Sequence, residues 1–565
     1  MPVPLHDLEV LALDCQATAA FPRGELLEVG WARSSASAAE EPEIETHVVA
    51  REGPARLPRR VRELTGLTPQ ELKAAPPRER VAERLTRAVA EANAATPCVG
   101  VAHFARFEQP YLRALLSSGD ELPFELLCTH ELARRLLPTL PRRGLRAVAG
   151  YLGHGVPELR RAAHHVAATL LIWRGLVSLL EEKHGIRELE DLRGWLTKTR
   201  PGRAPRSYPM ETRVRLDLPD QPGVYRFQRT DGSVLYVGKA TSLRQRVNTH
   251  FQSARGHKDR TLEMLAQARA VDVTPTGSVL EAALLEPDEI KRLRPPYNVA
   301  LQERDRRLGY WSWTLRSVAR RPDERHPLGP FPLRAPRPPL SALLQLLDSG
   351  GGARAAERLS ANVLGVPRRY APPLVCFCAG LGLFVRRHGR WWERGSPLGA
   401  LHALARRVAR RRSLEPVSLD APEDDEQSTP HERWSVEGVA GLLEDVVARG
   451  AHALRRSRWL CALGECSVAW TPDEAAGRPQ CLVLSRGAIV ARCSPEAGDD
   501  VPIPPGHAVP RRERQESIDL ATYDRLSALS RELRALVSVS ARVTLRLGPD
   551  TLLDRKALGP ALRCL

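Results

Sequence analysis

Two short β-prone runs on either side of an Asp-Gly pair constrain this chain more than any other feature. GVYRFQ at 223–228 and VLYVGK at 234–239 enclose RTDGS, and Asp-Gly between alternating apolar residues is typical of a tight β-hairpin. A helix in SLRQRVNTHFQ, a strand in AVDVTPT and a helix in VLEAALLEPDEIKRL follow. The sequence therefore predicts a small α/β domain over residues 217–302.

Polar and aromatic residues are placed through this block in a pattern that suits one reaction. Tyr225 and Tyr236 lie on the two predicted strands, and Arg246 lies on the helix after them. Glu286 lies on the second helix, and Asn298 follows it. A cation and a metal-binding carboxylate suit phosphodiester hydrolysis, because the phosphate gains negative charge at its leaving oxygen. Taken singly, each residue is better explained as structural.

Taken together and in this order, GVY, YVGKATSLRQRV, EAALLE and IKRLRPPYNV resemble the GIY-YIG nuclease domain, and closely its UvrC-type branch. The resemblance covers about 85 residues, from Leu218 to Gln302. It implies that Glu286 is the carboxylate ligand of one divalent ion, Mg²⁺ or Mn²⁺. One carboxylate completed by water and phosphate oxygens is a normal shell for Mg²⁺.

The same resemblance implies roles for five further residues. Tyr236 is expected to act as the base on the attacking water and Tyr225 to orient it; because a free phenol has a pKa near ~10, the base role needs a nearby cation. Arg246 and Lys239 are expected at the phosphate. Asn298 is expected to fix a loop near the metal. Every position that can be carried over holds the family's residue type, which predicts that activity is retained.

The resemblance fades beyond this block. HPLGPFPLRAP at 326–336 is similar to the Gly-Pro-aromatic-Pro segment that follows the nuclease domain in UvrC-type proteins. No spaced carboxylate set matches the second, RNase H-like nuclease of a full-length UvrC, and no clear helix-hairpin-helix follows. Single-nuclease, Cho-like proteins are therefore the better comparison, and they imply one incision rather than two.

The first part of the chain alternates predicted strands and helices. LEVLALD and ELLEVGWAR are predicted to be adjacent strands, PCVGVAHF a buried strand, and RERVAERLTRAVAEANAA an amphipathic helix. AAHHVAATLLIWRGLVSLLEEKHG is predicted to be a long helix that ends at a glycine. Its apolar run contains Arg174 and is expected to be too short to cross a bilayer. No signal peptide pattern opens the chain. An α/β domain with a mixed sheet is therefore expected.

From roughly Leu8 to Val177 this part resembles the DEDDh exonucleases of the proofreading epsilon type, which have an RNase H-like fold. VAHFARFEQPYL is similar to their second motif, normally His-Asn-x-x-Phe-Asp. RRAAHHVAAT occupies the third, normally His-x-x-x-x-Asp-Ala-x-x-Thr. Such an enzyme holds two metal ions on four carboxylates and uses the His as general base.

The residues at these catalytic positions depart from the family pattern. Asp14 fills the first position, Gln16 replaces a Glu, and Glu108 replaces an Asp. Arg160 stands where the base is expected, and His165 stands where the last Asp is expected. Two close divalent ions need carboxylates to offset their repulsion, and Arg cannot accept a proton. We therefore expect a fold whose two-metal site is lost but which retains a groove for DNA. A one-metal site on Asp14, Glu108 and His165 is the alternative.

The last part of the chain carries weaker signals. Residues 361–565 are expected to form a mixed α/β region of unknown role, with helices near 434–456 and 517–538 and a strand in ARVTLRL. WW at 391–392 lies among arginines, which suits either base stacking or a strand buried on one side.

Four cysteines of this region raise the question of a metal site. They are Cys376, Cys378, Cys461 and Cys466. Their spacing does not match the four-Cys cluster of some UvrC-type proteins, so buried thiols are the simpler expectation.

Charge and composition bound the class of partner. The chain has 84 Lys and Arg against 67 Asp and Glu, a formal charge of +17, which predicts a polyanionic partner, most often nucleic acid. A general bias toward Arg is the simpler alternative. The predicted organisation is an exonuclease-like domain at 1–190, a basic linker at 191–216, the nuclease domain at 217–302, a UvrC-like connector at 303–360 and the region 361–565.

The sequence thus predicts an α/β multidomain protein: an RNase H-like exonuclease fold, a small GIY-YIG domain and a mixed α/β C-terminal region. The expected function is metal-dependent, structure-selective cleavage of damaged, branched or single-stranded DNA in repair, as a nucleotide-excision-like incision. A damage-recognition protein is an expected partner, a membrane is not, and the expected location is the cytoplasm, at the nucleoid. The alternatives are a non-catalytic DNA-binding scaffold and a 3′–5′ exonuclease. The substitutions at Gln16, Arg160 and His165 argue against the last.

Overall fold

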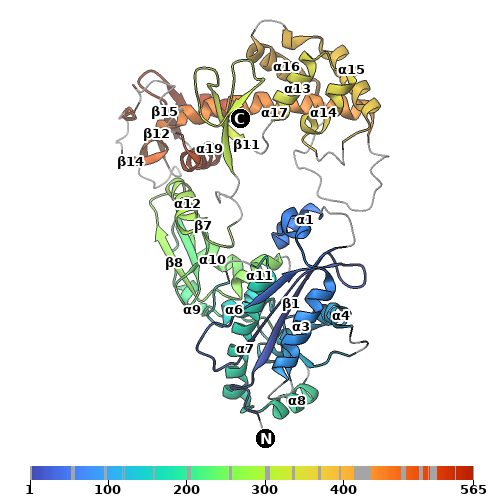
Figure 1. The fold of residues 1–565 in the computed structure, drawn as a ribbon. Helices are drawn as coiled ribbons and strands as arrows, with labels where there is room; N and C mark the ends of the chain where they lie inside the picture. Colours follow the sequence, from blue (N-terminus) through green and yellow to red (C-terminus); the bar gives the residue numbers. More distant parts are fainter. Residues whose placement is uncertain are drawn as a thin grey trace. The chain divides into compact units, whose positions relative to one another are not determined.

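The computed structural model divides into two compact units, which are described separately (Figure 1). The first contains residues 1–276 and 295–299, and the second contains 277–294 and 300–565. The division cuts through the predicted nuclease block, and the domain boundaries expected from the sequence stay predictions. The structure describes residues 3–51, 57–93, 98–117, 119, 121–156, 159–199, 205–252, 258–298, 306–333, 338–366, 371–393, 396–412, 434–471, 479–494, 500–506, 508, 518–540 and 542–563.

A five-stranded mixed sheet lies at the centre of the N-terminal part of the first unit (Figure 1). In the order β3-β2-β1-β4-β5, β1 is antiparallel to β2 and parallel to β4, and β4 is parallel to β5. This order and mixture of directions confirm the RNase H-like fold predicted from the sequence. The strands are β1 (Val10–Ala17), β2 (Leu26–Ser34), β3 (Glu45–Val48), β4 (Val99–Ala102) and β5 (Glu125–Cys128).

Helices cover this sheet and give it two apolar cores. One core packs α3 and α4 against β1, and its helical positions Val81, Leu85 and Val89 are those that the amphipathic pattern predicted. The other packs α5, α6 and α7 against the sheet. The helices are α1 (Arg59–Thr65), α2 (Pro69–Lys73), α3 (Arg78–Ala92), α4 (Ala105–Leu116), α5 (Thr129–Leu136), α6 (Leu145–Tyr151), α7 (Ala162–His184) and α8 (Leu189–Lys198).

Helix α7 is longer than its apolar run suggested. It has 23 residues and ends at Gly185, whose φ of 66° suits a residue without a Cβ. By length and composition it could cross a membrane, contrary to the expectation that it is too short. Half of its apolar window is nevertheless buried within the unit, with Trp173 fully covered. Arg174 donates to the Ser34 hydroxyl at 3.1 Å, so the charge that interrupts the run has a partner in the sheet.

A second, antiparallel sheet of the first unit has the order β7-β6-β8. Its first two strands form the predicted hairpin, with Gly223 paired to Ala240 and Phe227 to Tyr236. Asp231 supports the turn by accepting a hydrogen bond from the backbone of Ser233 at 2.9 Å. The elements are α9 (Thr212–Leu216), β6 (Gly223–Gln228), β7 (Val234–Ala240), α10 (Leu243–Gln252), α11 (Asp259–Leu265) and β8 (Ala270–Pro275).

The second unit contains two sheets, β10-β9-β11 and β14-β13-β12-β15-β16, and two apolar cores. The predicted helices near 434–456 and 517–538 are found as α17 and α19, and the strand in ARVTLRL as β15. The elements are α12 (Val279–Leu293), β9 (Arg307–Trp311), β10 (Val318–Ala319), β11 (Leu328–Leu333), α13 (Pro339–Asp348), α14 (Ala353–Leu364), α15 (Leu374–His388), η2 (Trp391–Glu393), α16 (Pro397–Arg412), α17 (Val436–Leu463), β12 (Glu465–Thr471), β13 (Gln480–Ser485), β14 (Ala488–Cys493), α19 (Leu520–Val539), β15 (Arg542–Arg546), β16 (Leu552–Asp554) and α20 (Arg555–Arg563).

The cysteines and the tryptophan pair of this unit are structural. Cys376 and Cys378 lie on α15 at one apolar core, and Cys461 and Cys466 lie in the other. Among the residues that the structure describes, no group of three or more His, Cys, Asp or Glu could hold a metal ion. Trp391 and Trp392 lie in a 3₁₀ helix with both rings buried, so neither stacking on bases nor a half-buried strand applies.

Candidate active site

The two tyrosines of the hairpin lie on one face of the second sheet. Tyr225 on β6 is fully buried and Tyr236 on β7 is half-buried, with ring centroids 6.0 Å apart. Gly238 pairs with Tyr225 across the strands. A Cβ at Gly238 would lie 2.6 Å from the Tyr225 hydroxyl, so only glycine leaves room for that phenol. The YVG triplet thus serves to position Tyr225.

His250 belongs to this cluster and was missed in the sequence. It lies on α10, and its Nε2 is 2.8 Å from the Tyr225 hydroxyl. Its ring centroid is 6.1 Å from that of Tyr236. His250 follows Arg246 by four residues, which places both on one side of α10. That spacing was the available signal, and it was not used.

The other predicted residues of the first unit surround the hairpin. Asn298 is buried, accepts from the backbone N–H of Val237 and donates to its carbonyl, both at 2.9 Å. It therefore ties the segment after α12 to the strand between Tyr236 and Gly238. Lys239 is half-buried on β7. Arg246 is exposed on α10, where an arginine can meet a phosphate.

Glu286 lies on α12, which falls in the second unit. Its side chain is half-buried, and Pro287 follows it inside the helix. Within that unit α12 is fixed to α19 through Asp524, which is 2% exposed: Lys291 lies 2.7 Å from its Oδ2 and Arg306 2.6 Å from its Oδ1. Because the Lys291–Asp524 contact anchors α12, the backbone that carries Glu286 has a defined position within this unit.

The donor chemistry of these residues fits one hydrated hard cation. Glu286 supplies a single carboxylate, and no cage of three or more acidic or soft ligands exists within the described parts of the chain. Mg²⁺ is commonly held by one or two carboxylates, with water and substrate phosphate completing its shell. The site therefore suits an ion that binds together with a phosphodiester.

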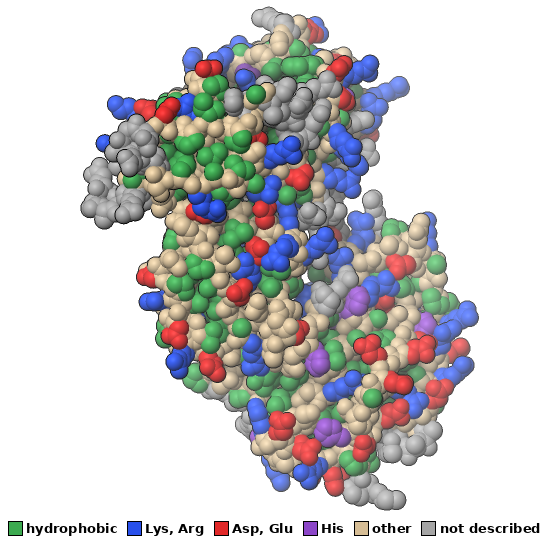
Figure 2. Space-filling model, turned by 90° about the vertical axis from the view of Figure 1, so that its left-hand side faces the viewer, with side chains coloured by type: hydrophobic (Ala, Val, Ile, Leu, Met, Phe, Trp, Pro, Cys, Tyr) green, Lys and Arg blue, Asp and Glu red, His purple; other side chains and the backbone are tan. Residues whose placement is uncertain are grey.

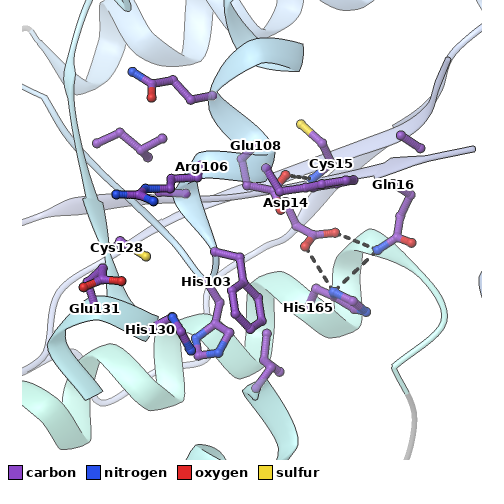
Figure 3. A pocket seen from close by; sticks show the side chains of 17 residues that line it. Asp14, Cys15, Gln16, His103, Arg106, Glu108, Cys128, His130, Glu131 and His165 are labelled. Atoms are coloured by element: carbon purple, nitrogen blue, oxygen red, sulfur yellow. Dashed lines mark hydrogen bonds and ion pairs between the residues drawn. The ribbon is translucent and has the colours of Figure 1, made fainter. Parts of the chain in front are cut away.

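Four of the five exonuclease-like positions, Asp14, Gln16, Glu108 and His165, meet in a pocket of about 690 Å³ in the first unit (Figure 3). Asp14, at 6% exposure, accepts from both neighbours: Nδ1 of His165 lies 3.1 Å from its Oδ1, and Gln16 donates to its Oδ2 at 2.9 Å. The Asp14 carboxylate is thus occupied by the chain's own side chains. Burial alone lowers the pKa of His165, but the hydrogen bond and charge of Asp14 outweigh it and raise that pKa.

The second retained acid is buried beside Asp14. Glu108 is 4% exposed and accepts from the backbone N–H of Cys15 at 2.6 Å. Burial, and then the negative charge of Asp14, raise the pKa of Glu108 well above its ordinary value. The amide of Gln16 and the imidazole of His165 supply none of the negative charge that two close divalent ions need. The residues present therefore do not fit a two-metal centre.

Two sequence interpretations of this pocket stay predictions. The alternative of one metal ion on Asp14, Glu108 and His165 gains no support, because no group of three or more such residues that could hold a metal is found in the part of the chain that the structure describes. Arg160 is not among the residues that line the pocket, and its side chain lies beside Gly66. The lining includes His103, Phe104 and His130, which the sequence analysis did not single out.

Comparison with known proteins matches the model of a UvrC-like GIY-YIG domain to residues 221–299. UvrABC system protein C of Sphingopyxis alaskensis is 52% identical over 86 residues, which cover 15% of this chain and 13% of that protein. A bifunctional exonuclease/endonuclease protein of Mycobacterium tuberculosis is 31% identical over 258 residues, 43% of this chain and 38% of its own length. The chain thus spans well under half of either relative.

Two solved structures are similar to parts of the chain. The GIY-YIG domain of UvrC from Thermotoga maritima, bound to its catalytic magnesium, is 29% identical, with 16% of this chain and all of that chain covered and a TM-score of 0.15. The nuclease domain of 3′hExo, a DEDDh family member bound to rAMP, is 14% identical, with 32% and 95% covered and a TM-score of 0.27. The family match over the block that carries Tyr225, Tyr236 and Glu286 shows that this chain contains a UvrC-like GIY-YIG endonuclease domain.

Proposed function

We propose that this protein is a metal-dependent, structure-selective endonuclease that hydrolyses a phosphodiester bond of DNA during repair. The observation that carries the proposal is the cluster of Tyr225 and Tyr236 on the hairpin with His250 on α10, within the matched domain. A buried polar network of this kind is preorganised, and preorganised groups lower the barrier of a reaction that develops charge.

Each residue of the cluster has a role in this proposal. Tyr236, the more accessible phenol, takes the proton of the attacking water, while Tyr225 orients that water and is itself held by His250. Arg246 and Lys239 bind the phosphate. Asn298 keeps the β7 backbone in place through Val237. These groups act by position and charge, without forming a covalent intermediate.

Glu286 would hold the cation, Mg²⁺ or Mn²⁺. The related Thermotoga maritima domain is described with a catalytic magnesium ion. When bound, such an ion supplies positive charge to the scissile phosphate and its leaving oxygen.

We further propose that the exonuclease-like domain is inactive and helps to bind DNA. The carboxylate of Asp14 is engaged by His165 and Gln16, whose side chains stand in place of two acids, which supports the loss of the two-metal site. Lys and Arg side chains are spread over the face of the molecule in Figure 2 rather than gathered in one stripe. Phosphate contacts at many points, which add to affinity without sequence preference, would agree with the charge of +17.

The expected setting is the bacterial cytoplasm at the nucleoid, on damaged, branched or single-stranded DNA, with a damage-recognition protein as partner. The relatives named UvrABC system protein C support a role in excision. The incision would be single, because the second nuclease of a full-length UvrC has no counterpart in the sequence.

A 3′–5′ exonuclease is the second candidate, and one observation favours it: the Mycobacterium tuberculosis relative is described as both exonuclease and endonuclease. The contents of the pocket argue against it, because its metal-binding carboxylates are engaged or hard to ionise. A silent DNA-binding scaffold is the remaining alternative.

End-labelled duplex, flap and lesion-bearing DNA, incubated with Mg²⁺ or Mn²⁺, tests the proposal. Wild-type protein should release internal fragments, and Tyr236→Phe should release at least about a hundredfold less, in the range of a lost general base. Tyr208→Phe is the matched control, because it also removes one phenol of the first unit, from a half-buried residue beside Phe251. No cleavage of any substrate by wild type would leave the scaffold as the better account.

A further inference from the structure

Helix α6 of the exonuclease-like domain contacts helix α11 of the nuclease block, within one compact unit. Ala266, which follows α11, is fully buried in the apolar core that also contains Val148 and Ala149 of α6. Arg269 adds a polar contact: it donates to the Tyr151 carbonyl at 3.0 Å, and its guanidinium lies 4.5 Å from the centroid of the Tyr151 ring. The two domains therefore share part of one hydrophobic core.

A glutamine side chain is enclosed between the two domains. Gln267 is fully buried, and its amide meets Gly150 of α6, where an added Cβ would lie 2.1 Å from Oε1. Its Oε1 accepts from Arg229 at 3.0 Å, and its Nε2 donates to the Tyr297 hydroxyl at 2.5 Å and to the Glu263 carbonyl at 3.0 Å. A buried amide with three partners is held in one orientation. The glycine of α6 leaves room for that orientation.

Tyr297 connects the buried amide to the catalytic hairpin. Its hydroxyl accepts from the amide and donates to a carboxylate oxygen of Glu263 at 2.7 Å. Burial, and then the negative charge of Glu263, raise the pKa of Tyr297, so the phenol keeps the proton that it donates. The backbone N–H of Tyr297 donates to the Leu235 carbonyl on β7 at 3.1 Å. The next residue, Asn298, holds Val237 on the same strand.

These contacts form a continuous path from α6 to the strand that carries Tyr236. In order, the path contains Gly150, Gln267, Tyr297, Asn298 and Val237, and all five are buried. In a close-packed interior a displaced side chain has no empty space to enter, so its neighbours must move with it. A change at α6 should therefore reach the catalytic strand.

We propose that the exonuclease-like domain holds the catalytic strand of the GIY-YIG domain in its working position, with Gln267 and Tyr297 as positioning residues. This inference rests on the proposed endonuclease function. Because both side chains are buried, they act through Asn298 on the place of Tyr236 and not on DNA. The exonuclease-like domain is thus part of the framework of the nuclease, whether or not chemistry occurs at Asp14.

Gln267→Met tests this path, because methionine fills a similar volume and makes none of the three hydrogen bonds. In the full chain without metal or DNA, the Val237 amide proton should exchange about tenfold faster than in wild type, measured by hydrogen–deuterium exchange of the β7 peptide. Single-turnover cleavage in Mg²⁺ should be about tenfold slower. The affinity for DNA in EDTA should stay within about twofold. A lower melting temperature with an unchanged rate would indicate a merely structural role and would overturn the proposal.

Gly150→Ala reaches the same amide from the other domain and alters no residue of the nuclease block. The added Cβ must displace the Gln267 amide, so this variant should show both faster exchange at Val237 and slower cleavage. Gly194→Ala on α8 is the matched control, because its Cβ meets no atom within 4 Å and both quantities should equal those of wild type. Equal changes in the two glycine variants would overturn the proposal.

A second control weakens the same contact away from the path. Arg142→Ala removes an ion pair with Asp259 at 2.8 Å, between exposed side chains of the two domains, and should leave exchange and cleavage unchanged. Effects as large as those of Gln267→Met would overturn the specific path.

The exchange measurement separates this inference from the proposed function. If wild type cuts no DNA, faster Val237 exchange in Gln267→Met would still support the path, and only the endonuclease would be rejected. If wild type cuts DNA, either of two results would overturn the inference: wild-type exchange at Val237 in Gln267→Met, or faster exchange with the wild-type cleavage rate.

Discussion

Nδ1 of His165 lies 3.1 Å from Oδ1 of Asp14, at the place where a two-metal exonuclease would hold its cations. Gln16 donates a hydrogen bond to Oδ2 of the same carboxylate. When protonated, the imidazole supplies a positive partner for this carboxylate, so the contact joins the end of β1 to α7. The stability that this contact adds should therefore depend on pH.

Two raised pKa values make this part of the domain sensitive to pH. Glu108 and His165 both have folded-state pKa values above their unfolded ones, so each group holds its proton more tightly in the folded chain. Their contribution to stability should therefore fall as the pH rises, whereas the lowered pKa values of His103 and His130 act in the opposite direction. The contribution of the Asp14–His165 pair is fully present below about pH 6.5 and is lost as the pH rises through the raised pKa of His165.

Calorimetric melting of the full chain between about pH 5.5 and 9 measures this contribution. His165→Gln should cost roughly 1.5–3 kcal/mol at the acidic end, as for a hydrogen bond to a charged group, and progressively less toward the alkaline end. His47→Gln is the control, because His47 pairs with Glu45 within the half-buried strand β3. A pH-independent cost of His165→Gln would contradict the account.

Restoring the acids should restore a need for metal. In Gln16→Glu/His165→Asp, the new carboxylates lie beside Asp14, and their repulsion should lower the melting temperature by several degrees. Mn²⁺ should then raise the melting temperature. At a hundredfold excess over its Kd, Mn²⁺ binding should add about 2.7 kcal/mol to the free energy of unfolding. Both proteins should also carry Glu286→Gln, so that no Mn²⁺ binds at the ion site proposed for the GIY-YIG domain. Equal Mn²⁺ responses with and without the restored acids would count against a lost two-metal site.

His250 should act through Tyr225 and not on the substrate. His250→Phe removes the partner of the phenol while keeping a ring of similar size, and should slow single-turnover cleavage by about tenfold or more with little change in DNA affinity. His250→Gln, which retains a hydrogen-bonding group, should recover part of the rate. Thr249→Ala, an exposed neighbour, is the control. Equal rates for His250→Phe and wild type would remove His250 from the site.

Gly238→Ala tests whether a glycine is required at this position to leave room for the Tyr225 hydroxyl. The added Cβ would lie 2.6 Å from the hydroxyl, so the ring must move, at a cost of roughly 1–3 kcal/mol in stability and at least about tenfold in rate. Gly194→Ala on α8 meets no atom within 4 Å and should be neutral or slightly stabilising. A variant at Gly238 with the wild-type melting temperature and rate would contradict the close contact.

The local elements were predictable because their signals are local. The Asp-Gly turn, the apolar spacing of α3 and the glycine after α7 each depend on a few neighbouring residues. The mixed sheet β3-β2-β1-β4-β5 was predicted from the order of strands, helices and motifs along the chain. Residues 361–565 carried no motif, so the strand order of their five-stranded sheet, β14-β13-β12-β15-β16, could not be predicted from the sequence.

The site was predictable only where residue type and motif agreed. The spacing of four residues from Arg246 places His250 on the same side of α10, but its contact with Tyr225 depends on how α10 packs on β6, and for that reason His250 was missed. Arg160 was placed in the pocket by alignment with a motif, yet its side chain lies at Gly66. Phe104 gives no sign in sequence of its positive φ. Each case depends on tertiary geometry and not on the identity of the residue.

The central claim assigns cleavage to Glu286 and none to Asp14. The direct measurement follows DNA labelled at either end, in Mg²⁺, with wild type, Glu286→Gln and Asp14→Asn, and with Asp288→Asn as a carboxylate control on the same helix that pairs with Arg525. Internal cuts should fall by at least about a hundredfold in Glu286→Gln alone. Internal cuts that persist in Glu286→Gln, or stepwise trimming that is lost in Asp14→Asn, would contradict the account.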